Sequence, residues 1–237
     1  MAKFPVESLA KFNTSGLKQI GHTLAAGLKP MGRAVANARL RDHQLCVHKP
    51  TSRHLLDLRQ IANVAKALPG LPADGETWHL VVKGHTPFWG FIPRLIALAE
   101  EPIAELKIST LGFGRRFAEW LLDALDSGQV GYVGLACSTY FRATSEGEYK
   151  LLADRLKPPN KLAVVRLHAK IIAARLGSGR GFVFEGSGNL RSCRMIEQCT
   201  VTQATDLCRF HQAWITELLD GPPANVCQAM QETEAGL

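Results

Sequence analysis

Five residues in the last third of the chain have the side chains that a phosphate-transfer site requires. His168 and Lys170 are two positions apart, Ser187 and Asn189 are likewise two apart, and Glu197 follows. Residues two positions apart in an extended chain project to the same side, so each pair can face one substrate. An imidazole could attack phosphorus while an ammonium, a hydroxyl and an amide hold the oxygens, and Glu197 could accept the second ring N–H. The set favours phosphoryl transfer through a histidine nucleophile.

The spacing of these residues resembles the signature of the phospholipase D superfamily, in which H-x-K is followed by an aspartate, by G-S-x-N and by a downstream glutamate. The chain has HAK at 168–170, GSGN at 186–189 and then Glu197. The aspartate position, five residues after Lys170, is occupied by Arg175. The resemblance covers roughly residues 78–219. It implies a phosphodiesterase that works without a metal ion or any other cofactor.

The resemblance also implies that two subunits share one site. A complete site in the superfamily contains two copies of the signature, and this chain carries one. A homodimer would supply the second copy. One His168 would attack phosphorus to form a phosphohistidine intermediate, and the His168 of the other subunit would protonate the leaving oxygen.

Strand and helix patterns alternate from Trp78 onward, and these elements must position the site. Strands are expected at 78–83, 104–111, 129–137 and 162–167, with helices at 88–100, 115–126 and 146–156. A hairpin of runs 168–176 and 181–185 follows, then a strand at 196–203 and a helix at 206–219. This order predicts an α/β, phospholipase D-like fold, with a mixed, mainly parallel sheet and helices on both faces.

Further binding residues are expected beyond the carboxyl ends of the strands, where open α/β sheets bind their ligands. They combine aromatic, hydroxyl and basic side chains: His85, Trp89, Arg115, Arg116, Ser138, Tyr140 and Arg142. Arg115 and Arg116 begin a helix, where backbone N–H groups favour phosphate. Trp89 and Tyr140 could stack on bases if they are exposed, or they could be ordinary core residues. Both interpretations stay open at this point.

The positive charge of the chain is concentrated in its first third. The 237 residues include 28 Lys and Arg and 21 Asp and Glu, for a formal charge of +7. Residues 1–70 hold 11 basic and 3 acidic residues, whereas residues 71–237 hold 17 and 18. Such asymmetry predicts nucleic acid, DNA or RNA, as the partner. A solvated basic face or a targeting peptide would give the same pattern.

Pro- and Gly-rich residues 68–75 separate the basic part from the rest of the chain. We expect a basic amino-terminal arm or small helical module with its linker over 1–75, with helices at 6–12 and 53–68. A phospholipase D-like domain is expected over 76–222, followed by a carboxyl-terminal tail over 223–237.

Composition argues against export and against a membrane span. No apolar run approaches 18 residues, and charge and proline interrupt the amino terminus. Six cysteines lie far apart without a C-x-x-C pair, as reduced thiols do, so a cytoplasmic protein is expected. His43, Cys46 and His48 lack a fourth ligand at zinc-site spacing, and no metal site is assigned.

The leading hypothesis is a homodimeric, metal-independent hydrolase of nucleic acid, most simply a DNA-binding endonuclease. Two alternatives stay open. The chain could be a weakly active or inactive nucleic-acid-binding protein on the same scaffold, since Arg175 replaces the family aspartate. It could also be a lipid phosphodiesterase, which the resemblance allows.

Overall fold

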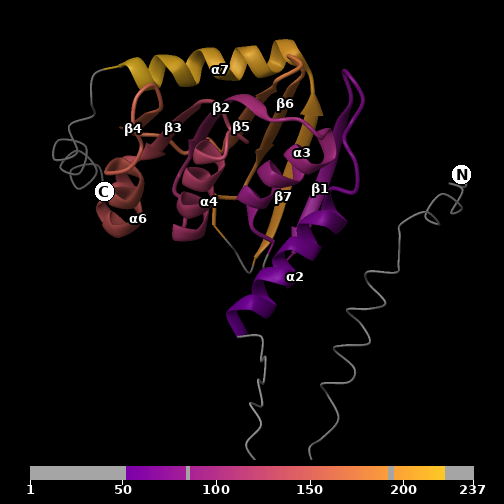
Figure 1. The fold of residues 1–237 in the computed structure, drawn as a ribbon, viewed down its shortest axis with the longest axis horizontal. Coiled ribbons are helices and arrows are strands. Elements are labelled where there is room, and N and C mark those ends of the chain that lie inside the picture. The colour runs from indigo at the N-terminus through magenta and orange to yellow at the C-terminus, as the bar shows by residue number, and fades with distance from the viewer. Residues whose placement is uncertain (1–51, 84–85, 192–194, 222–237) are drawn as a thin grey trace, which may run out of the picture. The chain divides into compact units, whose positions relative to one another are not determined.

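The computed structural model describes residues 52–83, 86–191 and 195–221, which contain one sheet of seven strands with helices around it (Figure 1). The elements in chain order are α2 (Ser52–Ala67), β1 (Thr77–Lys83), η3 (Phe88–Gly90), α3 (Phe91–Ala99), β2 (Ile103–Thr110), α4 (Arg115–Asp126), β3 (Val133–Ser138), α5 (Thr139–Thr144), α6 (Glu146–Ala153), β4 (Lys161–Val165), β5 (Ile171–Leu176), β6 (Gly181–Gly186), β7 (Ile196–Gln203) and α7 (Thr205–Asp220). Apart from α5, which was not predicted, these agree with the predicted elements within a few residues. The helix predicted at 6–12 lies outside the described residues.

The sheet has the strand order β1-β7-β6-β5-β2-β3-β4. Only β2–β3 and β3–β4 are parallel pairs, while β1–β7, β7–β6, β6–β5 and β5–β2 are antiparallel. The α/β class and the mixed sheet are confirmed, but the prediction of a mainly parallel sheet is wrong. The reason is that β5 runs back along β2, after which hairpin-like pairing adds β6, β7 and β1 in alternating directions.

The connection from β4 to β5 decides where the predicted catalytic residues lie. β4 is at one edge of the sheet and β5 is on the far side of β2, so the link over residues 166–170 crosses three strand spacings. At about 4.8 Å per spacing this is about 14 Å, which an extended link of this length can span. The Ser109 hydroxyl, at the end of β2, donates to the Ala169 carbonyl at 3.1 Å. The H-x-K segment therefore runs across the carboxyl ends of β2 and β3.

Alternating strand residues build a different layer on each face of the sheet. On one face, fully buried Leu106 and Ile108 join the core beneath α3 and α4, where the rings of Phe91 and Phe184 stack at 5.9 Å. On the other face, α7 covers the sheet from β4 to β6, and Cys208 packs against strand residues. Helices on both faces are thus confirmed. Each fully buried large apolar side chain contributes roughly 1.5–3 kcal/mol.

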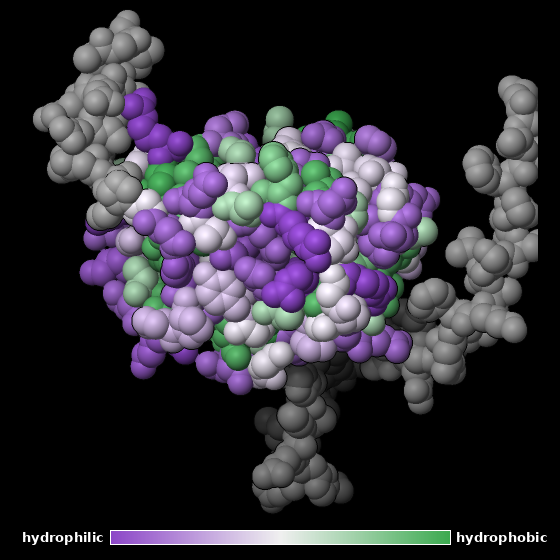
Figure 2. Space-filling view, turned by 90° about the horizontal axis from the view of Figure 1, so that it is seen from above, coloured by the Kyte–Doolittle hydropathy of each residue, from purple (hydrophilic) through white to green (hydrophobic). Residues whose placement is uncertain are grey.

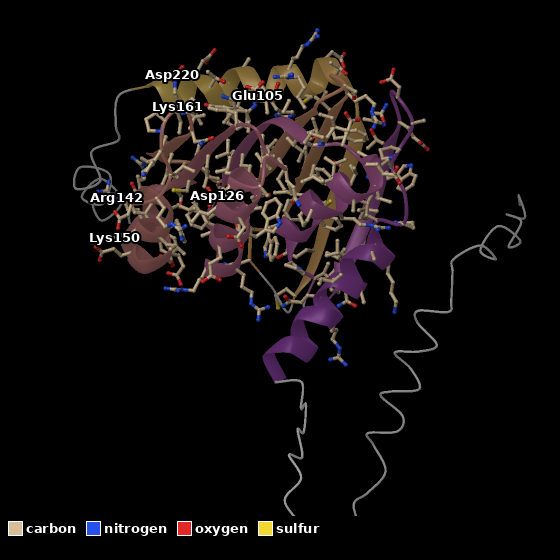
Figure 3. All side chains as sticks on the ribbon, in the orientation of Figure 1. Glu105, Asp126, Arg142, Lys150, Lys161 and Asp220 are labelled. Carbon is tan, nitrogen blue, oxygen red and sulfur yellow. The ribbon has the colours of Figure 1, made fainter. Side chains whose placement is uncertain are left out.

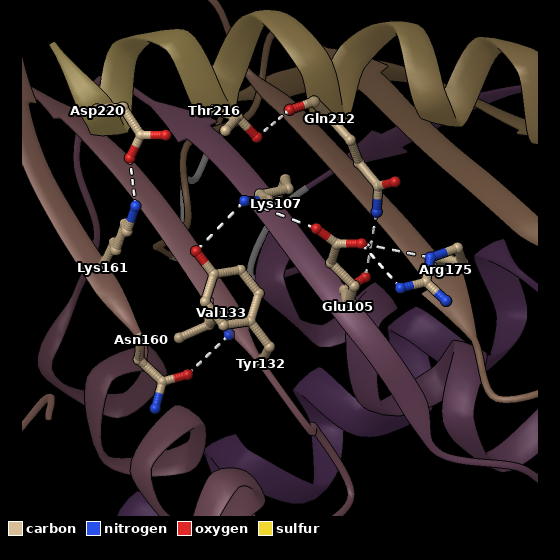
Figure 4. Close-up of polar contacts among 10 residues, drawn as sticks. All are labelled: Glu105, Lys107, Tyr132, Val133, Asn160, Lys161, Arg175, Gln212, Thr216 and Asp220. Atoms are coloured by element: carbon tan, nitrogen blue, oxygen red, sulfur yellow. Dashed lines mark hydrogen bonds and ion pairs between the residues drawn. The ribbon is translucent and has the colours of Figure 1, made fainter. Parts of the chain in front are cut away.

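The layer under α7 is more polar than the opposite core (Figure 4). Lys107 is only 4% exposed, and its ammonium donates to the Tyr132 hydroxyl at 3.3 Å and lies 3.6 Å from the Glu105 carboxylate. Seen from above, the molecule shows hydrophilic and hydrophobic side chains mixed on the side that carries α7 (Figure 2). Polar contacts therefore hold this helix on the sheet together with the small apolar cluster of Ala173, Val183 and Cys208.

Helix α2 matches the helix predicted at 53–68 and packs on the sheet domain. Val64, near its end, and Leu68, just beyond it, are buried in the same core as the strands. The Arg94 guanidinium donates to the Leu68 carbonyl at 3.0 Å. The predicted division of the chain near residues 70–76 stays a prediction, because residues 1–51 lie outside the description. None of the described helices is long and apolar enough to cross a membrane.

Candidate active site

His168 and Lys170 form the centre of the candidate site. The His168 side chain is exposed, whereas Lys170 is 9% exposed and lies beneath it. The ammonium lies 3.3 Å from Nδ1 and 3.5 Å from Nε2 of His168, and it donates to the His168 carbonyl at 3.0 Å. Burial lowers the pKa of Lys170, and the Glu197 carboxylate acts against this. The exposed imidazole of His168 is therefore in contact with the largely buried ammonium of Lys170.

Ser187 and Glu197 form a second pair beside this one. The Ser187 hydroxyl donates to the Glu197 carboxylate in a short hydrogen bond and accepts from the Gln198 N–H at 3.1 Å. The Ser187 N–H also donates to the Gln198 carbonyl at 3.0 Å. Ser187 is thus fixed to β7. Within the described residues the His168 ring bonds only to Lys170, so Glu197 holds Ser187 rather than the second ring N–H.

The glycines of the GSGN segment allow this close approach. A Cβ on Gly186 would lie 2.3 Å from the Gln198 carbonyl oxygen and 2.9 Å from the Cys199 Cα. A Cβ on Gly188 would lie 2.8 Å from the Phe88 ring. The Gly186 N–H contacts the Lys170 carbonyl at 3.4 Å, which joins the two halves of the signature. Without side chains at these positions, the segment can lie between β5, β7 and η3.

Asn189 is half-buried, and its Oδ1 atom is buried without a hydrogen-bond partner in the structure. The neighbouring Leu190 pairs with the loop after β2, through Leu190 N–H to Gly112 O at 3.2 Å and Gly114 N–H to Leu190 O at 3.1 Å. The Oδ1 atom can only accept a hydrogen bond, so the amide N–H groups of Asn189 are the donors that could face a phosphate oxygen.

Arg175, which replaces the family aspartate, lies outside this cluster. It pairs with Glu105 across β5 and β2, with Nη2 2.9 Å from Oε2. Arg175 lies five positions after Lys170, which corresponds to roughly 16 Å of extended chain. The charge of Arg175 is therefore paired with that of Glu105, at the end of β5 that lies away from Lys170.

The residues expected after β3 have mainly structural contacts. Ser138 is buried and caps α5: its hydroxyl donates to the Leu111 carbonyl at 2.6 Å and accepts from the Phe141 N–H at 3.0 Å. Tyr140 is 65% exposed on α5. The Arg142 guanidinium lies 5.3 Å from the centre of the Tyr149 ring, on the α5–α6 side of the molecule (Figure 3). Tyr140 and Arg142 are therefore both exposed to a ligand, whereas Ser138 is buried.

The residues expected after β1 and β2 gather around α4. Arg115 is exposed and pairs with Glu119 one turn along α4, at 3.5 Å. Arg116 donates to the Gln60 amide oxygen of α2 at 3.1 Å. Trp89 packs against Trp120, with ring centres 5.9 Å apart. His85 lies outside the described residues. The structure brings Arg116 and Trp89 together, beside but not within the His168–Lys170 pair.

Two further residues near the candidate site were not identified from the sequence. Ser109 holds the link over residues 166–170 in place through its hydrogen bond to the Ala169 carbonyl. In the sequence, Ser109 cannot be distinguished from any other polar residue of a strand. Arg191 is exposed two residues after Asn189, and its Cβ lies 3.5 Å from the Cβ position of Gly114. A basic residue so close to the motif was the available clue.

No group of three or more His, Cys, Asp or Glu side chains is placed to hold a metal ion in the part of the chain that the structure describes. The His43, Cys46 and His48 group lies outside it.

Comparison with known proteins places the chain near structures of low sequence identity. No family model and no curated protein matches it. It is similar to a phospholipase D family member, Nuc from Salmonella typhimurium, with 14% identity and a TM-score of 0.44 over 60% of this chain and 94% of Nuc. It is also similar to NucT from Helicobacter pylori, with 13% identity and a TM-score of 0.43 over 61% and 97%.

A third structure is polyphosphate kinase from Porphyromonas gingivalis, with 18% identity and a TM-score of 0.44 over 63% of this chain and 27% of the kinase. At such identities the likeness concerns the fold alone. Nuc belongs to the family whose signature the sequence resembles.

Proposed function

We propose that this chain is a metal-independent phosphodiesterase acting on nucleic acid. The observation that carries the proposal is the contact of the buried Lys170 ammonium with both ring nitrogens of exposed His168. Lysine can only donate, so a ring nitrogen that accepts from it carries no proton, and its lone pair becomes available to phosphorus once the ammonium turns to a phosphate oxygen. The same ammonium neutralises a phosphate oxygen once the substrate arrives.

The chemistry has two displacements at phosphorus. The His168 nitrogen forms a bond to phosphorus, the bond from phosphorus to the leaving oxygen breaks, and that oxygen takes a proton from a general acid. Water then attacks the phosphohistidine, its proton passes to the same group, and the P–N bond breaks. Lys170, Ser187 and Asn189 hold the non-bridging oxygens, and Glu197 orients Ser187.

The general acid comes from a second subunit in a homodimer. Among the described residues, no other histidine contacts His168, and one imidazole cannot serve on both sides of phosphorus. A two-fold axis beside this exposed site would place His168 of the partner subunit opposite the nucleophile.

Nucleic acid is the proposed substrate because the chain concentrates basic charge near its amino terminus. Residues 1–49 contain eight Lys and Arg and two Asp and Glu. Such a segment binds a phosphate backbone without sequence preference. Arg115, Arg116, Tyr140 and Arg142 are proposed as further substrate-binding residues, together with His85, Trp89 and Ser138.

The test is a substrate panel in excess chelator. Plasmid DNA, single-stranded DNA, RNA and phosphatidylcholine vesicles are each incubated with the wild-type chain and with His168→Ala. We expect cleavage of nucleic acid by the wild type alone. Hydrolysis of lipid would favour the lipid phosphodiesterase, and binding of nucleic acid without cleavage would favour the inactive scaffold.

A further inference from the structure

An apolar groove of about 480 Å³ lies between α2, α3 and α4, and we call it the tryptophan groove. Its residues are mostly apolar: Gln60, Ile61, Val64, Ala65, Pro87, Trp89, Gly90, Pro93, Arg94, Ala97, Arg116 and Trp120. Trp89 and Trp120 face one another with ring planes 33° apart, and Ile61 is 66% exposed. The volume is that of a site for a small organic group.

The tryptophan groove shares walls with the candidate active site. Phe88, which precedes Trp89 in η3, packs on Gly188 of the GSGN segment. Arg116 lies two residues after Gly114, whose N–H donates to the Leu190 carbonyl at 3.1 Å. Phe88 and Gly114, which lie close in the chain to the lining residues Trp89 and Arg116, therefore connect the groove with the GSGN segment.

The charge around the groove is positive. Arg94 and Arg116 line it, and none of the described residues that line it is acidic. Arg94 donates to the backbone carbonyls of Leu68 and Pro69, at 3.0 and 3.4 Å, and both of these acceptors are neutral groups. The apolar lining and the two arginines together fit a ligand in which a flat apolar group is joined to an anion. A nucleotide is such a ligand.

We propose that the tryptophan groove binds an unpaired base of a single-stranded nucleic acid whose phosphate lies at His168. The inference rests on the proposed function and narrows its substrate to single strands or locally unpaired duplex. A paired base is stacked on both faces inside a duplex, so it must leave the stack before it can enter the groove. Stacking on tryptophan tolerates every base, so little sequence preference is expected.

The experiment measures binding apart from cleavage. The His168→Asn chain, which keeps the substrate intact, is titrated against a labelled oligothymidine of roughly 12 nucleotides, the matching duplex, and the same backbone without bases. We expect the single strand to bind most tightly by fluorescence anisotropy. Adding Trp89→Ala should weaken single-strand binding by about tenfold to a hundredfold, and Trp89→Phe should restore most of it. The base-free strand should not respond to either change.

A matched pair of surface variants guards against a folding defect. Ile61→Ser removes an exposed apolar side chain from the groove, and Phe210→Ser removes one that is 62% exposed on α7. Neither change opens the core, so both chains should unfold at nearly the wild-type temperature. Single-strand affinity should fall severalfold with Ile61→Ser and stay unchanged with Phe210→Ser.

Equal affinity for strands with and without bases would overturn the proposal, as would a Trp89→Ala chain that binds like its parent. If decanoate quenches the tryptophan fluorescence and the oligonucleotide does not, the groove holds an acyl chain instead. Cleavage by the wild type is scored separately. Base-dependent binding without cleavage would refute the proposed phosphodiesterase activity but support base binding in the tryptophan groove. Cleavage with base-independent binding would support the activity and refute base binding in the groove.

Discussion

Arg175 on β5 and Glu105 on β2 face one another in register, with Nη2 2.9 Å and Nε 3.3 Å from the same carboxylate oxygen (Figure 4). The Arg175 side chain is 38% exposed and that of Glu105 is 25% exposed. The residue that replaces the family aspartate is thus part of a cross-strand ion pair under α7. Its effect is on the sheet and not on the phosphate site.

Introducing the aspartate of the phospholipase D signature at position 175 should destabilise this chain. Arg175→Asp places two carboxylates opposite one another, and Arg175→Ala only removes the pair, which contributes up to about 1 kcal/mol at such exposure. In urea unfolding we expect the aspartate variant to be the less stable of the two, with no gain in cleavage for either. The double variant Glu105→Arg with Arg175→Asp should recover part of the loss. A rise in turnover with Arg175→Asp would show that the position belongs to the site.

Local patterns were enough to predict most elements of the fold. The strong apolar periodicity of 115–126 predicted α4 with its observed bounds, and the Gly-Ser-Gly-Arg turn predicted the β5–β6 hairpin. The directions of the strands could not be predicted from local patterns. Alternation in β5 is the same whichever neighbour it pairs with, and only the crossing over residues 166–170 makes it antiparallel to β2.

The candidate site was predictable where spacing alone carries the geometry. Period-two spacing placed His168 and Lys170 together, and the structure brings Ser187 and Glu197 into contact. The helix-capping contacts of Ser138 could not be predicted from the sequence, because they depend on the positions of Leu111 and Phe141 in the fold. The tryptophan groove could not be predicted from the sequence either. One of its walls is formed by α2, which the sequence analysis assigned to the amino-terminal arm or module and not to the sheet domain.

Lys170 should be required for turnover rather than for folding. Lys170→Ala should lower cleavage by about a hundredfold or more, because the ammonium that neutralises the phosphate is lost. Loss of a buried cation with a lowered pKa should leave the unfolding midpoint unchanged or raise it. Initial rates in excess chelator, with thermal unfolding measured in parallel, check both. Activity that disappears in chelator and returns with Mg²⁺ would contradict the mechanism.

The first glycine of the GSGN segment should tolerate no side chain. Gly186→Ala would drive a Cβ to 2.3 Å from a backbone oxygen of β7, which costs about 1–3 kcal/mol or more and displaces Ser187. Gly147→Ala is the matched control, since nothing lies within 4 Å of its Cβ position in α6. There alanine should stabilise by about 0.5–1 kcal/mol. Urea denaturation should move the two variants in opposite directions.

The basic amino-terminal residues should set the salt dependence of binding. If they contact about four phosphates, the logarithm of the affinity for DNA should fall against the logarithm of salt concentration with a slope of roughly −3 to −4. Since α2 packs into the core, the deletion to compare stops at residue 49. That shortened chain should show a flatter slope. The same slope before and after deletion would remove the role assigned to this segment.

A site shared by two subunits should be visible in mixed dimers. Wild-type and His168→Ala chains are unfolded together in equal amounts and refolded, so that about one dimer in four contains two wild-type chains, by random pairing in a two-fold assembly. Each mixed dimer lacks either the nucleophile or the general acid, and either loss costs about a hundredfold or more. Cleavage per dimer should therefore be near one quarter of the wild-type value. Independent subunits would give near one half, because every wild-type chain would keep its own activity. Light scattering on the refolded sample verifies that dimers have formed, and a monomer that cleaves at full rate would refute the shared site.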